Sequence, residues 1–367
     1  MIRRDQFFFG EVPMSSVVLR SLGDVLPTLG VIVLVVVALE LLLYLVLKRM
    51  LNYKYSLAYM LVMPAALGLL VLVVYPIVYN IVIAFSDTNL FAGRFPTRPG
   101  SVSYGVGEFI DNIKLVFTAP VLKQEYFFPV FGRTMLWTFL QVAVHVTLGM
   151  MVAMLLNRPM KLRGFYRTVI LFPWAVPQVI AVLAWRGEFN FDYGYFNVIL
   201  TQMGFDKIPW MSDPFWNYLA VNMTNWWLGV PFMSVVLLGG LQSIDPSYYE
   251  AAEIDGGGKW VQFKEITLPL MRPVLTPAVV LGVIWTFNQF NVPFFINQQE
   301  LETSDILVTA LYRAAFEYNR YGFASAFAII IFLILMAFTL IYMRLSNFQV
   351  DVGQSKKRLA QAKTVGE

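Results

Sequence analysis

Long apolar runs alternate with polar segments along most of this chain of 367 residues. A helix needs about 20 apolar residues to cross the roughly 30 Å hydrocarbon core of a bilayer. Pro residues inside four of the runs do not exclude helices, because neighbouring helices can satisfy the freed backbone groups. The pattern predicts an all-α integral membrane protein whose seven spans are 27–47, 57–85, 130–156, 168–185, 215–241, 274–296 and 323–345.

Basic residues mark one side of the membrane. They cluster after the first, third and seventh runs, at Lys48, Arg49, Lys54, Arg158, Lys161, Arg163, Arg167, Arg344, Lys356, Lys357 and Arg358. Cytoplasmic loops carry such an excess of Lys and Arg. The charged loop 245–273 and the tail 346–367 fall on this side, so both are predicted to be cytoplasmic. The loops 86–129, 187–214 and 297–322 are then external.

The N-terminal topology stays open between seven and eight spans. Seven spans and a cytoplasmic C-terminus place the N-terminus outside, although Arg3 and Arg4 lie there. The segment 7–26 contains three charged residues, which favours a helix lying in the membrane interface over an eighth span.

Composition narrows the possible functions. The mean hydropathy is +0.64, hydrophobic residues make up 58% and charged residues only 14%, with a net charge of +4. A soluble domain is close to half apolar and about one quarter charged. The chain has no Cys and a single His, which excludes disulfides and paired His or Cys metal motifs. Gly258-Lys259 lacks the upstream Gly and the following Ser or Thr of a phosphate-binding loop, so ATP hydrolysis is not expected in this chain.

The charged loop carries clear helix signals. Asp245-Pro246 predicts a helix start, because the Asp side chain can cap free N–H groups and Pro is tolerated in the first turn. The three Gly residues 256–258 predict its end. A second helix is predicted for Lys259–Leu268, ended by Pro269 and with Trp260, Phe263 and Thr267 on one side. The loop should therefore form a helical pair that projects from the membrane.

The spacing of Glu250-Ala251-Ala252, Gly256, Ile266, Leu268 and Pro269 resembles the EAA signature of permease subunits of bacterial ABC importers. The resemblance implies a six-helix type I permease core with at least one extra N-terminal transmembrane helix. It also implies that the segment 243–273 is a coupling loop that docks into a groove on an ATPase subunit. The coupling residues would be Glu250, Ala251, Ala252, Asp255, Gly256, Ile266, Leu268 and Pro269. A solvated linker joining two spans is the alternative.

Two spans contain neutral polar residues beside aromatic rings. The fifth carries Asn222, Thr224 and Asn225, and the sixth carries Thr286, Asn288, Gln289 and Asn291. Amides at bilayer depth face other helices or a wet cavity. Sugar hydroxyls pair with amides and sugar faces stack on rings, but such amides also hold helices together. The residues alone favour neither interpretation. His145, in the third span, is expected to have a packing partner rather than a pore role.

Longer motifs are similar to the larger permease subunit of maltose/maltodextrin importers. They lie at 172–178, 225–232, 287–290 and 307–317, and the likeness extends over about 130–345. The resemblance implies that sugar is held by Trp174, Gln178, Asn225, Leu228, Gly229, Phe232, Thr286 and Gln289. Three of these depart from the family pattern, with Phe232 in place of Tyr, Thr286 in place of Asn and Gln178 in place of Ser.

The external loop 86–129 is much shorter than the large extracytoplasmic domain of the enterobacterial subunit, which predicts reduced contacts with a binding protein there. The family implies a second, smaller maltose-type permease, two ATP-binding subunits that hold ATP and Mg, and an extracytoplasmic sugar-binding protein. This chain itself would hold an oligosaccharide, with no cofactor and no nucleic acid, in the cytoplasmic membrane of a bacterium or archaeon.

The predicted division of the chain is an N-terminal segment 1–56 with the extra helix, a first core helix and external loop 57–129, the permease domain 130–345 and a tail 346–367. An ion-coupled secondary sugar transporter is the competing function, and it would depend on Glu40 and His145, the ionisable groups at bilayer depth. A membrane scaffold without a substrate is a third possibility.

Overall fold

The computed structural model describes residues 14–50, 52–90, 92–94, 100–297, 301 and 304–345. These residues are helical apart from turns, loops and two isolated β-bridges, Ser86 with Tyr104 and Asn89 with Arg94. The all-α prediction is confirmed. The chain forms two compact units, 1–80 and 81–367. The predicted tail 346–367 lies outside the described residues.

The first unit contains α1 (Met14–Leu43), the π-helical η1 (Tyr44–Met50), α2 (Ser56–Leu69) and η2 (Leu70–Val74). It also holds the first part of α3 (Tyr75–Ala84). The helices long and apolar enough to span a membrane are Val25–Met50 and Ser56–Ala84, as predicted. Of the segment predicted as an interfacial helix, residues 7–13 lie outside the described part. From Met14 onward the segment is continuous with the first span, and Pro27 lies inside that helix.

The second unit carries the remaining helices. They are α4 (Val106–Thr118), α5 (Phe127–Asn157), α6 (Arg163–Ala175), α7 (Gln178–Glu188), α8 (Tyr195–Gln202), α9 (Pro214–Gln242), α10 (Ser247–Ile254), α11 (Lys259–Val261), η3 (Gln262–Thr267), α12 (Leu268–Phe287), α13 (Asn291–Asn297), α14 (Leu307–Tyr312), η5 (Arg313–Glu317) and α15 (Tyr321–Leu345). The apolar spans lie at 127–157, 214–242, 259–297 and 321–344, which confirms four further predicted spans.

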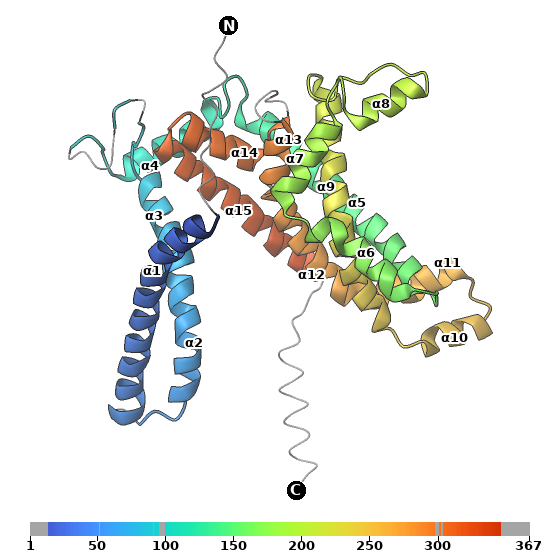
Figure 1. Cartoon of the computed structure of the whole chain (residues 1–367), viewed down its shortest axis with the longest axis horizontal. Coiled ribbons are helices and arrows are strands. Elements are labelled where there is room, and N and C mark those ends of the chain that lie inside the picture. Colours follow the sequence, from blue (N-terminus) through green and yellow to red (C-terminus); the bar gives the residue numbers. More distant parts are fainter. Residues whose placement is uncertain are drawn as a thin grey trace. The chain divides into compact units, whose positions relative to one another are not determined.

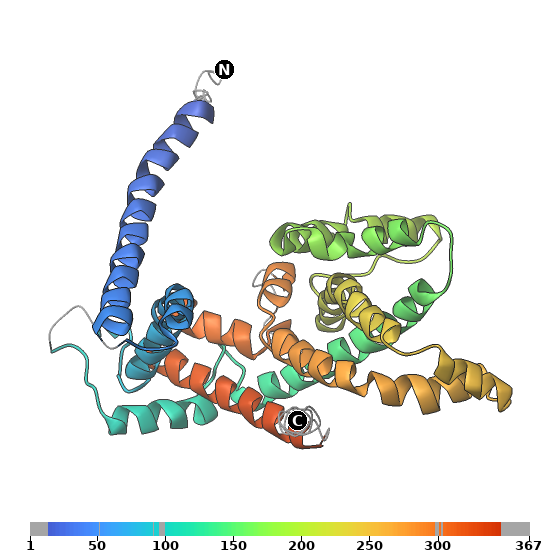
Figure 2. The same ribbon diagram turned by 90° about the horizontal axis from the view of Figure 1, so that it is seen from below.

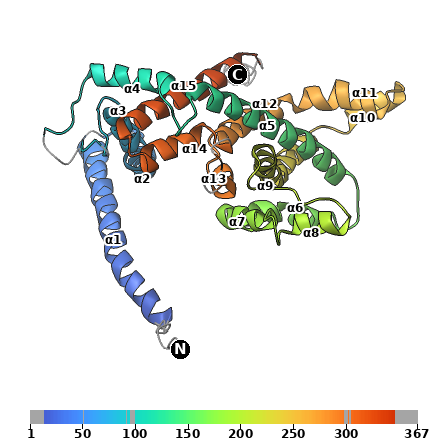
Figure 3. The same ribbon diagram turned by 90° about the horizontal axis from the view of Figure 1, so that it is seen from above.

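Helix α9 occupies the centre of this unit. Figures 2 and 3 show it between the layer of α6, α7 and α8 and the crossing pair α5 and α12. Its start is fixed by Asp213, whose carboxylate accepts from the N–H groups of Phe215 (2.9 Å) and Trp216 (3.1 Å), with Pro214 in the first turn. This arrangement leaves few unsatisfied donors at the helix end.

Small residues let the central helices approach closely. A Cβ added to Gly149 of α5 would lie 2.9 Å from Cγ of Met233, and one added to Gly240 of α9 would lie 2.7 Å from Cε of Met271. Met271 is fully buried. Close approach at small residues is a usual way for spanning helices to gain packing contacts in lipid.

The predicted span 168–185 is a bent pair rather than one straight helix. Helix α6 ends at Ala175, α7 begins at Gln178, and their axes differ by 86°. Val176 is extended with ψ 137°, because the ring of the following Pro177 disfavours the helical conformation at the residue before it. Pro173 is accommodated inside α6. This pair corresponds to the fourth predicted span. If it is counted as one span, the described residues contain seven spans in total.

The prediction that Pro269 ends the second helix of the charged loop is wrong. α11, η3 and α12 follow one another without a break from Lys259 to Phe287, and Pro269 lies in the first turn of α12. The preceding turn is π-helical, with the N–H of Leu268 bonded to the carbonyl of Phe263. This wider turn shifts the hydrogen-bond register just before Pro269, where a Pro in a regular helix would clash and remove a bond.

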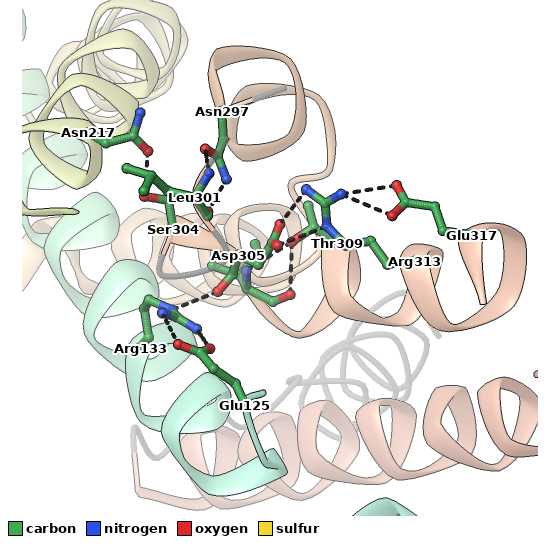
Figure 4. Close-up of polar contacts among 11 residues, drawn as sticks. Glu125, Arg133, Asn217, Asn297, Leu301, Ser304, Asp305, Thr309, Arg313 and Glu317 are labelled. Atoms are coloured by element: carbon green, nitrogen blue, oxygen red, sulfur yellow. Dashed lines mark hydrogen bonds and ion pairs between the residues drawn. The ribbon is translucent and has the colours of Figure 1, made fainter. Parts of the chain in front are cut away.

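A buried polar network holds the segment before α14 against α5 and α9 (Figure 4). Arg313 pairs with Asp305 at 2.8 Å and with Glu317 at 3.0 Å, and the side chains of Arg313 and Asp305 are 3% and 0% exposed. Arg133 of α5 donates to the carbonyl of Asp305 at 2.7 Å and pairs with Glu125. The ion pairs, together with the bond from Arg133 to the Asp305 carbonyl, therefore connect α5 with the segment before α14 and with η5.

Further bonds complete this network. The hydroxyl of Ser304 donates to Asn217 of α9, the side-chain amide of Asn297 donates to the carbonyl of Leu301, and the N–H of Leu307 donates to Thr134 of α5 at 2.9 Å. The segment leading into α14 is thereby tied to both central helices.

We predict that Asp305→Ala lowers the stability of the protein strongly, because it leaves the Arg313 guanidinium buried with one partner removed. Breaking a buried ion pair costs about 3–5 kcal/mol. The matched control is Asp111→Ala, whose pair with Lys114 spans 3.9 Å and is largely exposed, so its loss should cost less than about 1 kcal/mol. Thermal unfolding in detergent measures both. Equal unfolding temperatures for the two variants would contradict the assignment.

Candidate functional site

The charged loop forms the helical pair that was predicted, α10 followed by α11. The carboxylate of Asp245 accepts from the N–H of Ser247 at 2.9 Å. Hydrogen bonds from the backbone and the side chain of Ser247 lower the pKa of Asp245. Gly256 takes the left-handed conformation with φ +77°. The N–H of Gly257 bonds to the carbonyl of Ala252 at 2.7 Å and that of Gly256 to Glu253 at 3.1 Å, which is a Schellman ending of α10.

The two helices of the pair are joined at their base. The hydroxyl of Tyr249 lies 3.0 Å from that of buried Thr267, and the amide of Gln262 donates to the carbonyl of Gly257 at 3.1 Å. Of the three residues predicted to share one side, Trp260 and Phe263 have ring centroids 5.8 Å apart, and Thr267 is the buried contact of Tyr249. Figure 1 shows α10 and α11 projecting at the end of the second unit opposite α8.

The predicted coupling residues fall into two groups in this structure. Those on the helical pair face outward or are half-buried, namely Glu250, Ala251, Ala252, Asp255 and Gly256, and those beyond it are half-buried in the continuing helix, namely Ile266, Leu268 and Pro269. Large apolar side chains on the pair are also exposed, with Ile254 87% and Trp260 73% accessible. Exposed apolar groups among charged ones are typical of a protein-binding surface.

A cavity of about 720 Å³ lies between α6, α7, α9 and α12. All eight predicted sugar-binding residues line it: Trp174, Gln178, Asn225, Leu228, Gly229, Phe232, Thr286 and Gln289. The volume is in the range of small-molecule binding sites. Among the described residues of its wall there is no Lys, Arg, Asp or Glu.

Two helix breaks border this cavity. One is the bend at Val176-Pro177 between α6 and α7, and the other separates α12 from α13 at 288–290. The breaks are joined by a hydrogen bond of 2.8 Å from the amide nitrogen of Asn291, the first residue of α13, to the amide oxygen of Gln178, the first residue of α7. Broken helices are tolerated at membrane depth where they face protein or a water-filled cavity.

Three aromatic rings form one wall. The ring centroid of Phe232 lies 5.6 Å from Trp174 and 5.3 Å from Trp285. Trp174 and Trp285 are each more than half exposed. Exposed ring faces beside amides offer both stacking and hydrogen-bonding surface.

His145 has the packing partner that was expected and also lines the cavity. Its Nε2 lies 3.1 Å from the backbone carbonyl of Asn225. The ring also covers Gly229, where an added Cβ would lie 2.2 Å from Cε1 of His145. Since a carbonyl only accepts, Nε2 must carry the proton. Gly229 thus has a packing reason to be glycine, independent of any ligand.

Four amide side chains, from α5, α9 and the break after α12, form a hydrogen-bonded chain at the inner wall. The amide of Gln289 donates to Asn225 at 3.2 Å, Asn225 to Gln141 at 3.0 Å, and Gln141 to Asn222 at 2.8 Å. Gln141, which is fully buried, was not among the residues predicted from the sequence. Its position four residues before His145, on the same face of an apolar helix, was the available signal.

Two Trp residues were also absent from the predicted set. Trp137 of α5 donates from its indole nitrogen to the carbonyl of Thr286 at 2.9 Å, which holds the end of α12. Trp285 lines the cavity directly. Trp137 lies in an apolar run where an aromatic residue is ordinary, whereas Trp285 precedes Thr286 in the polar and aromatic stretch of the sixth predicted span.

This chain is similar to several known proteins. The family model "Binding-protein-dependent transport system inner membrane component" matches residues 145–351. The trehalose/maltose transport system permease protein MalF of Thermococcus litoralis is 31% identical over 296 residues, covering 81% of this chain and 95% of that protein. The maltodextrin transport system permease protein MalC of Streptococcus pneumoniae is 28% identical, covering 82% and 71%.

A solved structure shares the fold. It is that of a bacterial ABC transporter involved in the import of the acidic polysaccharide alginate, with a TM-score of 0.68 and 21% identity over 81% of this chain and 97% of that chain.

We predict that Gly229→Ala destabilises the protein, because its Cβ would overlap the His145 ring. Overpacking of this kind costs about 1–3 kcal/mol. Gly239→Ala in the same helix is the control, since nothing lies within 4 Å of its Cβ position, and removing a mid-helix Gly should stabilise by about 0.5–1 kcal/mol. Thermal unfolding should separate the two variants in opposite directions. A Gly229→Ala protein as stable as Gly239→Ala would refute the packing role.

Proposed function

Because the chain belongs to the family of binding-protein-dependent transport system inner membrane components, we propose that it is the permease subunit of an ABC importer that carries maltose-type neutral oligosaccharides. Sugar passes through the cavity between α6, α7, α9 and α12. The observation that carries the proposal is the wall of this cavity, which combines uncharged amides with exposed aromatic rings.

The chemistry of the wall supports an uncharged sugar. Gln178, Asn225 and Gln289 supply amide donors and acceptors for hydroxyl groups, and the Trp174–Phe232–Trp285 wall supplies faces for the apolar sides of pyranose rings. An anionic glycan entering a low-dielectric cavity would need a basic partner, and the described wall contains none. The names of the two relatives described above refer to trehalose and maltose in one case and to maltodextrin in the other.

The helical pair α10–α11 is the proposed coupling element. The exposed carboxylate of Glu250 and the apolar surface of Ile254 and Trp260 would dock on an ATPase subunit. Movement of that subunit would reach the cavity directly, because one unbroken helical run connects Lys259 in the pair to Thr286 in the cavity wall. At 1.5 Å per residue this run is about 40 Å long.

The proposed assembly has several further parts. A second, smaller permease would close the open side of the cavity, two ATP-binding subunits would hold ATP and Mg, and an extracytoplasmic binding protein would deliver the sugar. In this proposal, ATP hydrolysis and the Mg site belong to the ATP-binding subunits. Access would alternate by rearrangement at the two helix breaks. Membership of this family removes the support for an ion-coupled transporter.

We predict that Gln289→Ala and Asn225→Ala each raise the half-stimulating sugar concentration about tenfold. This is the concentration at which sugar half-maximally stimulates ATP hydrolysis by the reconstituted assembly. Asn288→Ala is the matched control, because its amide bonds to its own helix at Ile284, 2.9 Å away, and is exposed. Unchanged half-stimulating concentrations in both cavity variants would remove the proposed site.

We predict that Glu250→Lys combined with Gly256→Ala abolishes sugar-stimulated ATP hydrolysis and weakens co-purification of the ATPase. Charge reversal removes the docking carboxylate, and Ala at φ +77° costs about 1–2 kcal/mol in the turn. Asp111→Lys, an exposed charge reversal on α4, should leave both readouts unchanged. A double variant that still transports and still co-purifies with its ATPase would end the coupling role.

A further inference from the structure

The amide chain at the inner wall of the cavity ends on the protein backbone. The side chain of Asn222 donates from Nδ2 to the carbonyl of Tyr218 at 2.6 Å and accepts at Oδ1 from Nε2 of Gln141 at 2.8 Å. Oε1 of Gln141 accepts from Nδ2 of Asn225 at 3.0 Å, and Oδ1 of Asn225 accepts from Nε2 of Gln289 at 3.2 Å. Each amide thus donates to the next one inward.

The backbone carbonyl sets the direction of every bond in this chain. An amide side chain can usually rotate to exchange its oxygen and nitrogen, but a carbonyl oxygen can only accept. Asn222 must therefore present its nitrogen to Tyr218 and its oxygen to Gln141. Gln141 must then present its oxygen to Asn225, which in turn presents its oxygen to Gln289.

The direction of the chain determines what the cavity offers to a ligand. Gln289 lines the cavity and its nitrogen is directed to Asn225, so its oxygen lies on the other side of the amide group. No hydrogen bond within the described part of the chain engages that oxygen. We propose that Gln141, although it does not touch the ligand, is a positioning residue that holds Gln289 as a hydrogen-bond acceptor for a sugar hydroxyl.

This inference rests on the proposed function and defines the polarity of the ligand. Gln178 shows the opposite arrangement, since its oxygen accepts from Asn291 at 2.8 Å and its nitrogen remains for the cavity. The preferred ligand therefore places a hydroxyl donor at Gln289. A sugar with a free hydroxyl on the edge that faces Gln289 meets this condition.

Gln141 can act only through its neighbours. It is 0% exposed and does not line the cavity, and its two partners, Asn222 and Asn225, are 2% and 5% exposed. Removing its side chain leaves Asn225 without its hydrogen-bond acceptor. Asn225 can then turn its nitrogen toward Gln289, which responds by turning its own nitrogen into the cavity.

The test uses the complete importer reconstituted in lipid, with maltose delivered by its binding protein and ATP hydrolysis as the readout. Gln141→Leu should raise the half-stimulating sugar concentration about tenfold and leave the maximal rate within about twofold, because only ligand binding is altered. Asn222→Leu, which detaches the chain from Tyr218 without changing Gln141, should act in the same direction. Thr138→Val is the control, since Thr138 is buried on α5 one turn before Gln141 and its hydroxyl has no partner in the described residues.

A double-mutant cycle separates positioning from a structural role. If Gln141 acts through Gln289, adding Gln141→Leu to Gln289→Ala should raise the half-stimulating concentration by less than about twofold. The proposal would be overturned if Gln141→Leu again raised the half-stimulating concentration tenfold in the Gln289→Ala background. It would also be overturned if Gln141→Leu and Asn222→Leu each left that concentration unchanged. So would the failure of both single variants to assemble, since the chain would then be structural. Absence of any maltose dependence in the wild-type assembly would instead reject the proposed function.

Discussion

A polar side chain left unpaired among apolar helices is costly, and this cost governs the amides at the centre of the molecule. The side chains of Gln141, Asn222 and Asn225 are nearly inaccessible, and leaving a buried amide unpaired costs about 1–3 kcal/mol. Each is paired with the next, and the series ends on the Tyr218 carbonyl. Helices α5 and α9 are thereby held in one register, from which the cavity wall follows.

The same cost explains why irregular backbone occurs at the cavity. Helices end at Val176-Pro177 and again after Phe287, and residues at both breaks line the cavity. Backbone groups freed by a break can be satisfied there by protein or by water in the cavity. The bond between Gln178 and Asn291 fixes the two breaks to each other. Breaks of this kind provide both the surface that meets a ligand and the points at which the helices can move.

Energy input and ligand binding are located on one continuous helical run. Because the helix passes through Pro269 instead of ending there, Trp260 on the projecting pair and Thr286 at the cavity belong to the same rod. Helix α5, which packs against this rod, is held near its N-terminal end by Arg133. The Arg133 side chain donates to the carbonyl of Asp305 in the buried polar network. A rigid rod joined to an anchored core is an arrangement that transmits displacement rather than absorbing it.

The sequence alone determined the membrane class, the spans and the helical pair, because apolar run length, Asp-Pro starts and Gly stops are local signals. It also indicated the eight cavity residues, although only through resemblance. The bend at Pro177, the passage through Pro269 and the role of Gln141 were decided by tertiary structure. A Pro breaks or continues a helix according to the hydrogen-bond register and packing around it. A lone Gln in an apolar run has no visible purpose until another helix places Asn222 and Asn225 beside it.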